Sequence, residues 1–231
     1  MTRSGLILPV LLFTFIGCNG SGSGGKLPDI CENKTPEWVV DADGNQVKQG
    51  QDWSCQPNGA WGSATNYKSG KEHGTFTAWH ETGVKSVEGG YLDGKKHGTW
   101  TSWYENGVKQ HETEYQDGKD HGTWTSWYEN GKKKVETEYQ DGKLHGTMTH
   151  WYENRVKKLE AEYQDGKEHG TATFWYENGV KQIESGFLDG KKHGTVTVWY
   201  ENGVKQIEGG FLDGNPHGTW TSWNENGELK R

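Results

Sequence analysis

Alternation of apolar and polar side chains, in short segments, is the clearest pattern along this chain. In the segment 109–115, every second residue falls on one face of an extended strand, and that face carries Lys109, His111, Thr113 and Tyr115. Segments of this kind are about 6–8 residues long and rich in Thr, Trp, Tyr, Val and Ile, as strands are. Apolar residues at helical spacing are absent from them. The pattern therefore predicts an all-β protein.

The strand pattern returns every 24 residues, marked by a His-Gly-Thr triplet that occurs seven times between His73 and Thr219. A fixed period of this length indicates one supersecondary unit copied in tandem, each copy burying surface against its neighbours. We therefore predict that 63–231 is an elongated, single-layer antiparallel meander of tandem 24-residue β-hairpins.

Two turn signals recur in the copies, as at Asn106-Gly107 and Asp117-Gly118. Asn-Gly is the strongest short hairpin signal, because both central residues of its turn take positive φ. Each copy then reads as a strand, a tight Asn-Gly turn, a second strand and a looser Asp-Gly turn. Two copies depart from this pattern, with Thr82-Gly83 and Asn154-Arg155. Arginine at a position of positive φ is expected to cost on the order of 1 kcal/mol.

The second strand has a face of aliphatic, small and aromatic residues that we expect to be packed. Which residues of the first strand share that face depends on the turn, because a shift of one residue reverses every side chain. A two-residue turn pairs Ser102 with His111 and places Trp100 on the packed face. A three-residue loop at 105–107, with a bulge, places Trp103 there instead. We favour the two-residue turn because Asn-Gly prefers it.

These repeats resemble the MORN repeat, especially its bacterial variant. The resemblance is carried by the segments 112–127 and 208–214, the second reading Glu-Gly-Gly-Phe-Leu-Asp-Gly, and it extends from about Asn58 to the last residue. It implies a twisted sheet of hairpins that serves as a scaffold for protein partners and sometimes lies on membranes. Some bacterial members are described as antitoxins.

Composition narrows the classes of function. The chain has a formal net charge of −7, which argues against binding nucleic acid, whose phosphates require clustered Lys and Arg. Only 30% of residues are hydrophobic, whereas 13 are tryptophan. A conventional globular core requires more aliphatic residues. A thin sheet held by rows of aromatic side chains does not.

The first residues resemble a bacterial lipoprotein signal over 1–17. Arg3 precedes an apolar run of 11 residues, Leu6 to Ile16. As a helix this run is about 16 Å long, too short for a bilayer core of about 30 Å. Cys18 would then carry lipid, followed by a flexible Gly/Ser tether over 18–29, which predicts a lipid anchor in the bacterial cell envelope. The alternative is an ordinary cleaved signal with an incidental cysteine.

The two other cysteines, Cys31 and Cys55, form an even pair that suggests a disulfide in an exported protein. They lie 24 residues apart, which in the regular sheet places them two strands and about 9.6 Å from each other. A disulfide requires Cα atoms closer than about 7 Å. We therefore predict that 30–62 is an irregular, disulfide-bonded cap over the first hairpin.

A histidine recurs in every copy, which raises the question of a metal site. Successive copies are expected to lie about 9.6 Å apart. Zinc ligands lie about 2 Å from a shared ion, so one ion cannot bridge neighbouring copies. We predict no metal and interpret these residues as turn histidines that hydrogen-bond local backbone. They are His73, His97, His121, His145, His169, His193 and His217.

A tryptophan row occupies the same position in every copy. Under the favoured register it lies on the Thr and Glu face, where exposed rings would bind a peptide strand, a glycan or another sheet. The alternative is that the rings stack internally with Thr and with Lys stems, and so stabilise a one-layer sheet. The row consists of Trp79, Trp103, Trp127, Trp151, Trp175, Trp199 and Trp223.

Catalytic chemistry is not indicated. The glutamates Glu88, Glu112 and their copies form a row of identical residues, which offers no pair with the distinct environments that acid–base catalysis needs. We predict a non-enzymatic, surface-anchored binding or scaffold protein without a cofactor, whose repeat sheet engages a protein. The alternatives are a carbohydrate-binding module that uses the tryptophan row and an antitoxin-like neutraliser of a toxin.

Overall fold

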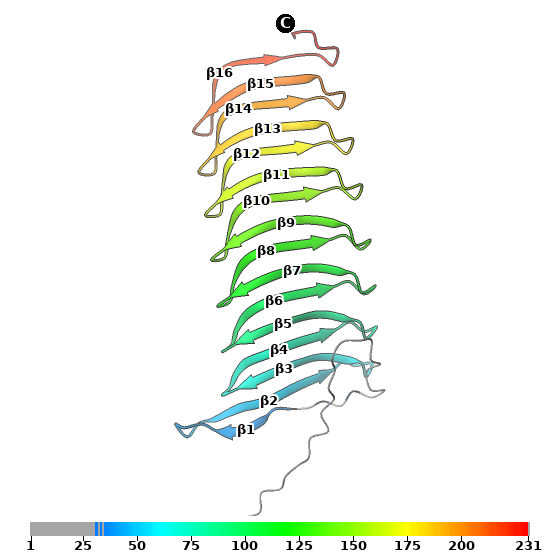
Figure 1. Ribbon diagram of the computed structural model, residues 1–231, viewed down its shortest axis with the longest axis vertical. Helices are drawn as coiled ribbons and strands as arrows, with labels where there is room; N and C mark the ends of the chain where they lie inside the picture. The colour runs from blue at the N-terminus through cyan, green and yellow to red at the C-terminus, as the bar shows by residue number, and fades with distance from the viewer. Residues whose placement is uncertain (1–30, 32, 34, 231) are drawn as a thin grey trace, which may run out of the picture.

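One continuous sheet makes up the computed structural model, which describes residues 31, 33 and 35–230. Its sixteen antiparallel strands pair in chain order, each with its neighbours in sequence (Figure 1). The strands are β1 (Glu37–Val40), β2 (Gln46–Cys55), β3 (Trp61–Lys68), β4 (Lys71–Trp79), β5 (Lys85–Leu92), β6 (Lys95–Trp103), β7 (Lys109–Gln116), β8 (Lys119–Trp127), β9 (Lys133–Gln140), β10 (Lys143–Trp151), β11 (Lys157–Gln164), β12 (Lys167–Trp175), β13 (Lys181–Leu188), β14 (Lys191–Trp199), β15 (Lys205–Leu212) and β16 (Asn215–Ser222).

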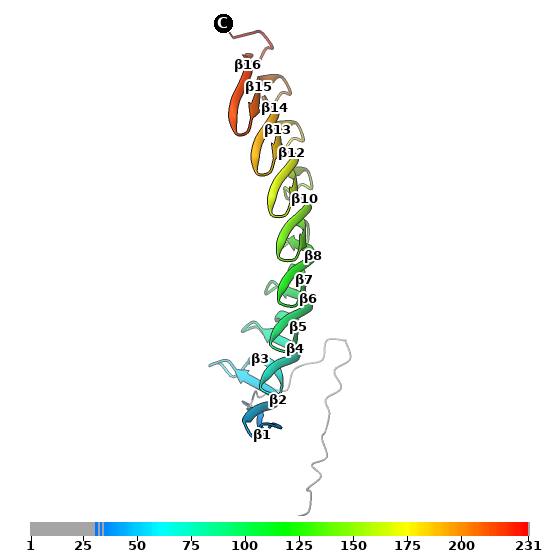
Figure 2. The same ribbon diagram turned by 90° about the vertical axis from the view of Figure 1, so that its left-hand side faces the viewer.

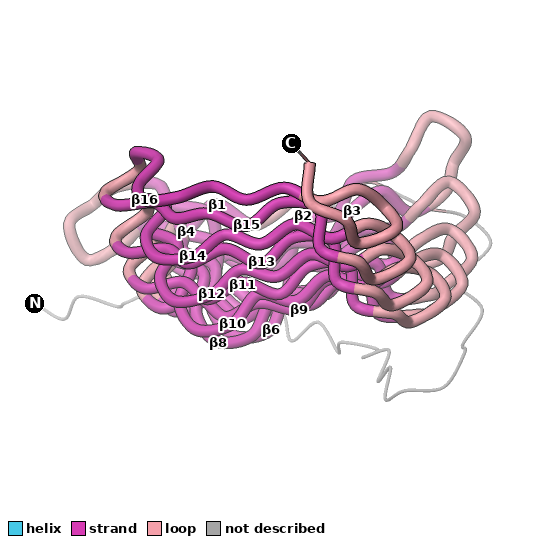
Figure 3. The backbone as a smooth tube through the Cα atoms, turned by 90° about the horizontal axis from the view of Figure 1, so that it is seen from above, coloured by secondary structure: helices cyan, strands magenta, loops and turns pink. Residues whose placement is uncertain are grey.

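The strands are stacked one after another along the long axis of the molecule. Seen edge-on, the stack is long and one layer thick, and seen from above the hairpins overlie one another (Figures 2 and 3). The predicted all-β, elongated, single-layer antiparallel meander is therefore confirmed. Among the described residues, no helix is long and apolar enough to cross a membrane.

The Asp-Gly pairs make the tight turns. Asp117 and Gly118 have φ of 52° and 82°, and the flanking residues Gln116 and Lys119 pair directly. Two central residues at positive φ define the two-residue hairpin turn whose twist matches that of the strands. The looser turn that the sequence predicts at Asp-Gly is therefore wrong.

The Asn-Gly pairs make three-residue loops. At 105–107, the Tyr104 amide donates to Val108 O and the Gly107 amide to Tyr104 O, both at 2.9 Å, and only Gly107 has positive φ (81°). The two-residue turn predicted here is wrong, because the Asn106 side chain accepts the Val108 amide at 2.9 Å and so stabilises a turn that ends in a glycine bulge. Arg155 replaces this glycine and takes φ of 71°, the positive value expected.

The favoured strand register is nevertheless present. Ser102 pairs with His111, and Trp100 pairs with Thr113. A register shift between Ser102 and Trp103 brings Trp103 opposite Lys109, and this second bulge offsets the extra residue of the loop. As a consequence, Lys109 joins the face of the glutamates instead of the packed face on which simple alternation places it.

The His-Gly-Thr triplet builds a bulge in every copy. Between β7 and β8 the pairing changes from Glu112 with Thr125 to Glu114 with His121, so Thr113 faces an excess of residues on β8. The triplet glycine, Gly122, has φ of 71°, which a residue with a side chain rarely adopts. The His-Gly-Thr triplet therefore forms a β-bulge, which bends the strand.

The packed face is thin and closely fitted. Its small residues are almost fully covered, with Thr137 and Ala161 only 2% and 1% exposed. Where a tryptophan occupies the facing position, the small residue is reduced to glycine in two copies. A Cβ added to Gly89 would lie 2.1 Å from the Trp100 ring, a contact too close to exist without rearrangement.

A disulfide links Cys31, the first described residue, to the sheet. It joins Cys31 to Cys55, with Cα atoms 5.8 Å apart. The strand that ends at Cys55, β2, already has the geometry of the repeats, because the Gly70 amide donates to Lys48 O at 2.8 Å just as the Gly118 amide donates to Lys96 O at 2.9 Å. The repeat geometry therefore starts at β2, before the boundary at residue 63 that the sequence suggests.

The remaining part of the predicted organisation falls outside these residues. The predicted signal (1–17), the lipidation site Cys18 and the tether (18–29) all lie outside the described residues.

Candidate binding face

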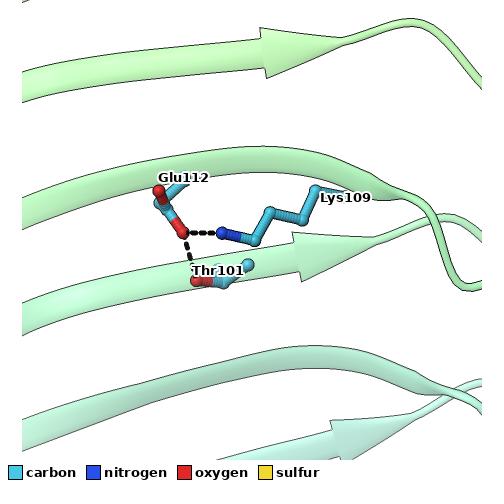
Figure 4. A network of polar contacts seen from close by, with 3 residues as sticks. All are labelled: Thr101, Lys109 and Glu112. Carbon is cyan, nitrogen blue, oxygen red and sulfur yellow. Dashed lines mark hydrogen bonds and ion pairs between the residues drawn. The ribbon is translucent and has the colours of Figure 1, made fainter. Parts of the chain in front are cut away.

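The tryptophan row lies on the face of the threonines and glutamates, which we call the tryptophan face. Within one copy, Lys109 Nζ forms an ion pair with the Glu112 carboxylate, and the same carboxylate accepts a hydrogen bond of 3.3 Å from Thr101 Oγ1 (Figure 4). The bulge that moves Lys109 onto this face makes the ion pair possible.

Lys109 also covers a tryptophan of the following copy, and four of its copies do the same. Lys109 Nζ lies 5.7 Å from the centre of the Trp127 ring, within the range of a cation–π contact. The arrangement recurs for Lys85 over Trp103 (5.9 Å), Lys133 over Trp151 (5.6 Å), Lys157 over Trp175 (5.9 Å) and Lys181 over Trp199 (5.8 Å). The row is therefore part of the contact between copies.

A tyrosine ladder holds the backbone of the same tryptophans. The Tyr104 hydroxyl donates a hydrogen bond of 2.9 Å to the Trp127 carbonyl of the next copy. In the first copies, His80 Nε2 and Gln56 Nε2 take the tyrosine's place, at 2.8 Å and 2.9 Å from the carbonyl oxygens. The other members are Tyr128 to Trp151 (2.7 Å), Tyr152 to Trp175 (2.9 Å), Tyr176 to Trp199 (2.9 Å) and Tyr200 to Trp223 (2.9 Å).

The rings of the tryptophan row are half-buried in all seven copies. The threonines of the same face are covered more completely, and Thr125 and Thr173 are only 8% and 7% exposed. The lysine contacts of the row agree with the stacking interpretation, whereas binding by the row stays a prediction. The rings stabilise the one-layer sheet, and their uncovered portions, together with the Lys–Glu pairs, form the outer surface of the tryptophan face.

Three of the repeated histidines, His73, His169 and His193, lie near the acidic turn of the following copy. His73 Nδ1 is 3.4 Å from Asp93 Oδ1, and His193 Nδ1 is 3.7 Å from Asp213 Oδ1. These ring nitrogens are buried without a hydrogen-bond partner, so each contact becomes an ion pair only when the ring is protonated. At His73, His169 and His193, the contact of Nδ1 is therefore with a carboxylate and not the expected hydrogen bond to local backbone. Within the described ranges, no group of three or more His, Cys, Asp or Glu side chains is placed to hold a metal ion.

Two further histidines, His111 and His150, sit on the packed face. His111 Nδ1 lies 3.2 Å from Ser102 Oγ, and its ring is 5.4 Å from that of Trp124. Burial, and then the positive charge of Lys134, lower the pKa of His111 below its ordinary value. Burial likewise lowers the pKa of His150, with Lys158 and Lys134 adding to it.

Tandem hairpins joined edge to edge in one open sheet define a repeat protein that offers extended surfaces for contacts. Its repeats belong to the MORN family: five segments match the MORN repeat variant, namely 96–117, 120–141, 168–189, 192–213 and 216–231. The copy between 144 and 165 is not among them, and it is the copy that carries Arg155 in place of the turn glycine. No curated protein matches the chain.

Proposed function

We propose that this chain is a non-enzymatic scaffold, anchored in the cell envelope through lipid on Cys18, that engages a protein partner on its tryptophan face. The observation that carries the proposal is the recurrence of one cluster along that face. The cluster is a half-buried tryptophan, a lysine over its ring and a glutamate paired with that lysine, as in Trp127, Lys109 and Glu112.

Rigidity favours binding by such a face. The tyrosine ladder and the turn amides fix each copy to the next, so the clusters recur about every 9.6 Å with little freedom to lose on association. Tryptophan is among the residue types that contribute most at protein interfaces, and a rim of charged pairs gives the contact its register.

A protein partner is favoured over a glycan by what covers the rings. A sugar stacks on an open aromatic face, but here a lysine ammonium of the preceding copy lies over five of the seven rings of the row, as Lys133 does over Trp151. The surface that remains alternates indole and ion pair, which suits a protein surface of mixed polarity.

The face can be tested with a photo-crosslinking residue at either of two positions. Glu184 lies on the tryptophan face, whereas Phe174 lies on the packed face and pairs with Ile183 next to Glu184. The two side chains are similarly exposed, so they form a matched pair. In cells that produce the chain, we expect a discrete crosslinked protein from position 184 and none from position 174. Crosslinking from position 174 alone, or capture of a glycan, would refute the proposal.

The anchor has its own test. Intact-mass measurement of the chain from the membrane fraction is expected to show diacylated or triacylated Cys18, and a Cys18→Ala variant is expected to leave that fraction. An unmodified Cys18 in membrane-associated chain would rule out the lipid anchor while leaving the partner face untouched.

A further inference from the structure

A small apolar contact joins the three-residue loops of successive copies. A Cβ placed on Gly131 would lie 3.8 Å from Val108 Cγ1, so the valine of one loop packs directly over the glycine of the next. The same pair is formed by Val156 with Gly179, Val180 with Gly203, and Val204 with Gly227. Between the first and second of these contacts, the equivalent positions are Lys132 and Arg155. The two substitutions are therefore a single altered contact, in which a valine–glycine pair becomes a pair of cations.

The charge of these two loops differs from that of their copies. Residues 129–134 hold three lysines and one glutamate, and residues 153–158 hold two lysines, one arginine and one glutamate, so the two segments together carry a net charge of +4. The equivalent segments 105–110, 177–182 and 201–206 each hold one glutamate and one lysine and are neutral. A strongly basic spot thus stands out in a chain whose formal net charge is −7.

The altered pair lines one cleft on the tryptophan face. The cleft is bounded by Trp127, Gly131, Lys132, Lys133, Trp151 and Arg155.

Lys133 is already occupied in this cleft, since it pairs with Glu136. Lys132 Nζ donates a hydrogen bond of 2.6 Å to Glu153 O. The Asn130 side chain, whose copies donate to that backbone carbonyl, turns to Glu153 Oε2 at 3.1 Å instead. Lys132 thereby has two remaining donors in the cleft.

Arg155 is the unpaired cation of the cleft. Its side chain is exposed, and within the described residues its guanidinium has neither a hydrogen bond nor an ion pair. Its backbone has φ of 71°, in the region that the other copies fill with glycine. Left-handed backbone and two adjacent positive charges both oppose folding, and neither is needed for the sheet, because four other copies form the same contact without them.

We propose that this cleft binds an acidic segment of the protein partner, with Arg155 and Lys132 pairing its carboxylates and Trp127 and Trp151 packing against its side chains. This inference rests on the proposed function and names the chemistry of the partner. An arginine fork matches a carboxylate in a bidentate pair, and indole packs well beside it.

A protein segment fits better than a repeating polyanion. A polysaccharide or a nucleic acid carries its charges at a regular spacing. A repeat array that binds such a ligand is expected to present an unpaired cation in every copy. Here the cation pair occurs in one contact only, between the loops at Asn130 and Asn154, and the neighbouring loops are neutral. Recognition at a single point is what one acidic cluster on a protein requires. The net charge of +4 of segments 129–134 and 153–158 already counts Glu129 and Glu153, and Glu136, which pairs with Lys133, lowers it only to +3.

The test uses the full chain and a short labelled peptide of alternating glutamate and leucine, with its glutamine counterpart as the neutral probe. Fluorescence anisotropy is measured at low and high salt. Replacing the pair by the residues of the other copies, Lys132→Val with Arg155→Gly, is expected to weaken binding of the glutamate peptide about tenfold, the effect of two exposed charge contacts. The glutamine peptide is expected to bind weakly to both proteins.

Two variants sharpen the result. Lys143→Gln with Lys167→Gln removes the same charge at the Asp-Gly turns, at the ends of the strands away from the cleft. This variant is expected to change affinity by less than about twofold. Moving the pair to the next-but-one contact, by Val180→Lys with Gly203→Arg in the reverted protein, is expected to restore binding. Thermal unfolding and far-UV spectra confirm that each variant is folded.

Three results would overturn the inference: equal loss of affinity in the charge control, unchanged binding after the reversion, or binding of an oligouronate in preference to the peptide. The proposed function fails separately. If position 184 still crosslinks to the partner in the reverted chain as strongly as in the original, the scaffold proposal stands and the acidic-segment inference falls. If peptide binding follows the prediction but no partner is crosslinked, the cleft binds acidic segments as inferred and the scaffold proposal falls.

Discussion

The hydroxyl of Tyr128 donates a hydrogen bond of 2.7 Å to the backbone carbonyl of Trp151, which lies in the next copy of the repeat. The bond spans 23 residues of sequence and links the loop edge of one hairpin to that of the next. It adds a side-chain link to the backbone pairing that joins the two copies.

Removing that hydroxyl is expected to destabilise the array. Tyr128→Phe leaves the part-buried Trp151 carbonyl without its donor, at a cost of about 1 kcal/mol in the free energy of unfolding. Chemical denaturation followed by tryptophan fluorescence measures the change. Tyr163→Phe is the matched control, because phenylalanine already occupies the equivalent positions Phe187 and Phe211, and it is expected to change stability by less than about 0.5 kcal/mol. Equal effects of the two substitutions would show that the ladder does not stabilise the fold.

A second prediction concerns the glycine beneath Trp100. Gly89→Ala places a methyl group 2.1 Å from the indole, and is expected to destabilise the sheet by about 1–3 kcal/mol. Trp100→Ala in the same chain removes the clash and reproduces the pair formed by Ala161 and Ala172. In a double-mutant cycle, the two substitutions are therefore expected to be coupled by more than about 1 kcal/mol. Simple additivity would mean that the ring moves aside freely.

A third prediction follows from the backbone of Arg155. Its φ of 71° is one that glycine adopts without strain, so Arg155→Gly is expected to raise the free energy of unfolding by about 1 kcal/mol. Thermal unfolding provides the measurement. Arg155→Ala is the control: it removes the guanidinium but keeps the Cβ, and the gain is expected to be absent. A similar gain in both variants would assign the effect to charge repulsion with Lys132 instead of to the backbone.

A fourth prediction concerns acid. The lowered pKa values of His111 and His150 mean that the folded chain resists protons that the unfolded chain accepts at its ordinary pKa of about 6.5. Their contribution to stability is therefore complete above about pH 6.5 and is lost as the pH falls through and below that value. His111→Val with His150→Ser, residues found at the equivalent positions Val135 and Ser126, is expected to reduce the loss of melting temperature between about pH 7.5 and 5.5. An unchanged pH dependence would exclude these two rings as its source.

The sequence was sufficient for the meander and for the packed face, because the period, the alternation and the turn pairs act locally in every copy. The two turn types are reversed relative to the prediction: Asp-Gly makes the tight two-residue turn and Asn-Gly the three-residue loop. Asn106 uses its side chain to accept the Val108 amide, which favours a three-residue loop, and Asp117 adopts the positive φ expected of the asparagine. The bulge at Gln110 that restores the register depends on pairing across strands, which side-chain alternation does not record.

The tyrosine ladder was missed for a related reason. A tyrosine follows the tryptophan in five copies, from Trp103-Tyr104 to Trp199-Tyr200, so the signal was present in the sequence. Its acceptor, however, is a backbone oxygen two strands away, and a pattern of side chains does not point to such an atom. The position of Lys109 on the tryptophan face was missed because the bulge reverses it.

At both ends of the strands, hydrogen bonds between successive copies join residues at a constant separation in sequence. At one end the Gly118 amide reaches back to Lys96, and at the other Tyr104 reaches forward to Trp127. A duplication or deletion of one whole period leaves every such hydrogen bond intact, whereas a gain or loss of a few residues within a copy breaks the hydrogen bonds on both of its sides. Related chains are therefore expected to differ in length by whole 24-residue copies and to tolerate single-residue insertions poorly.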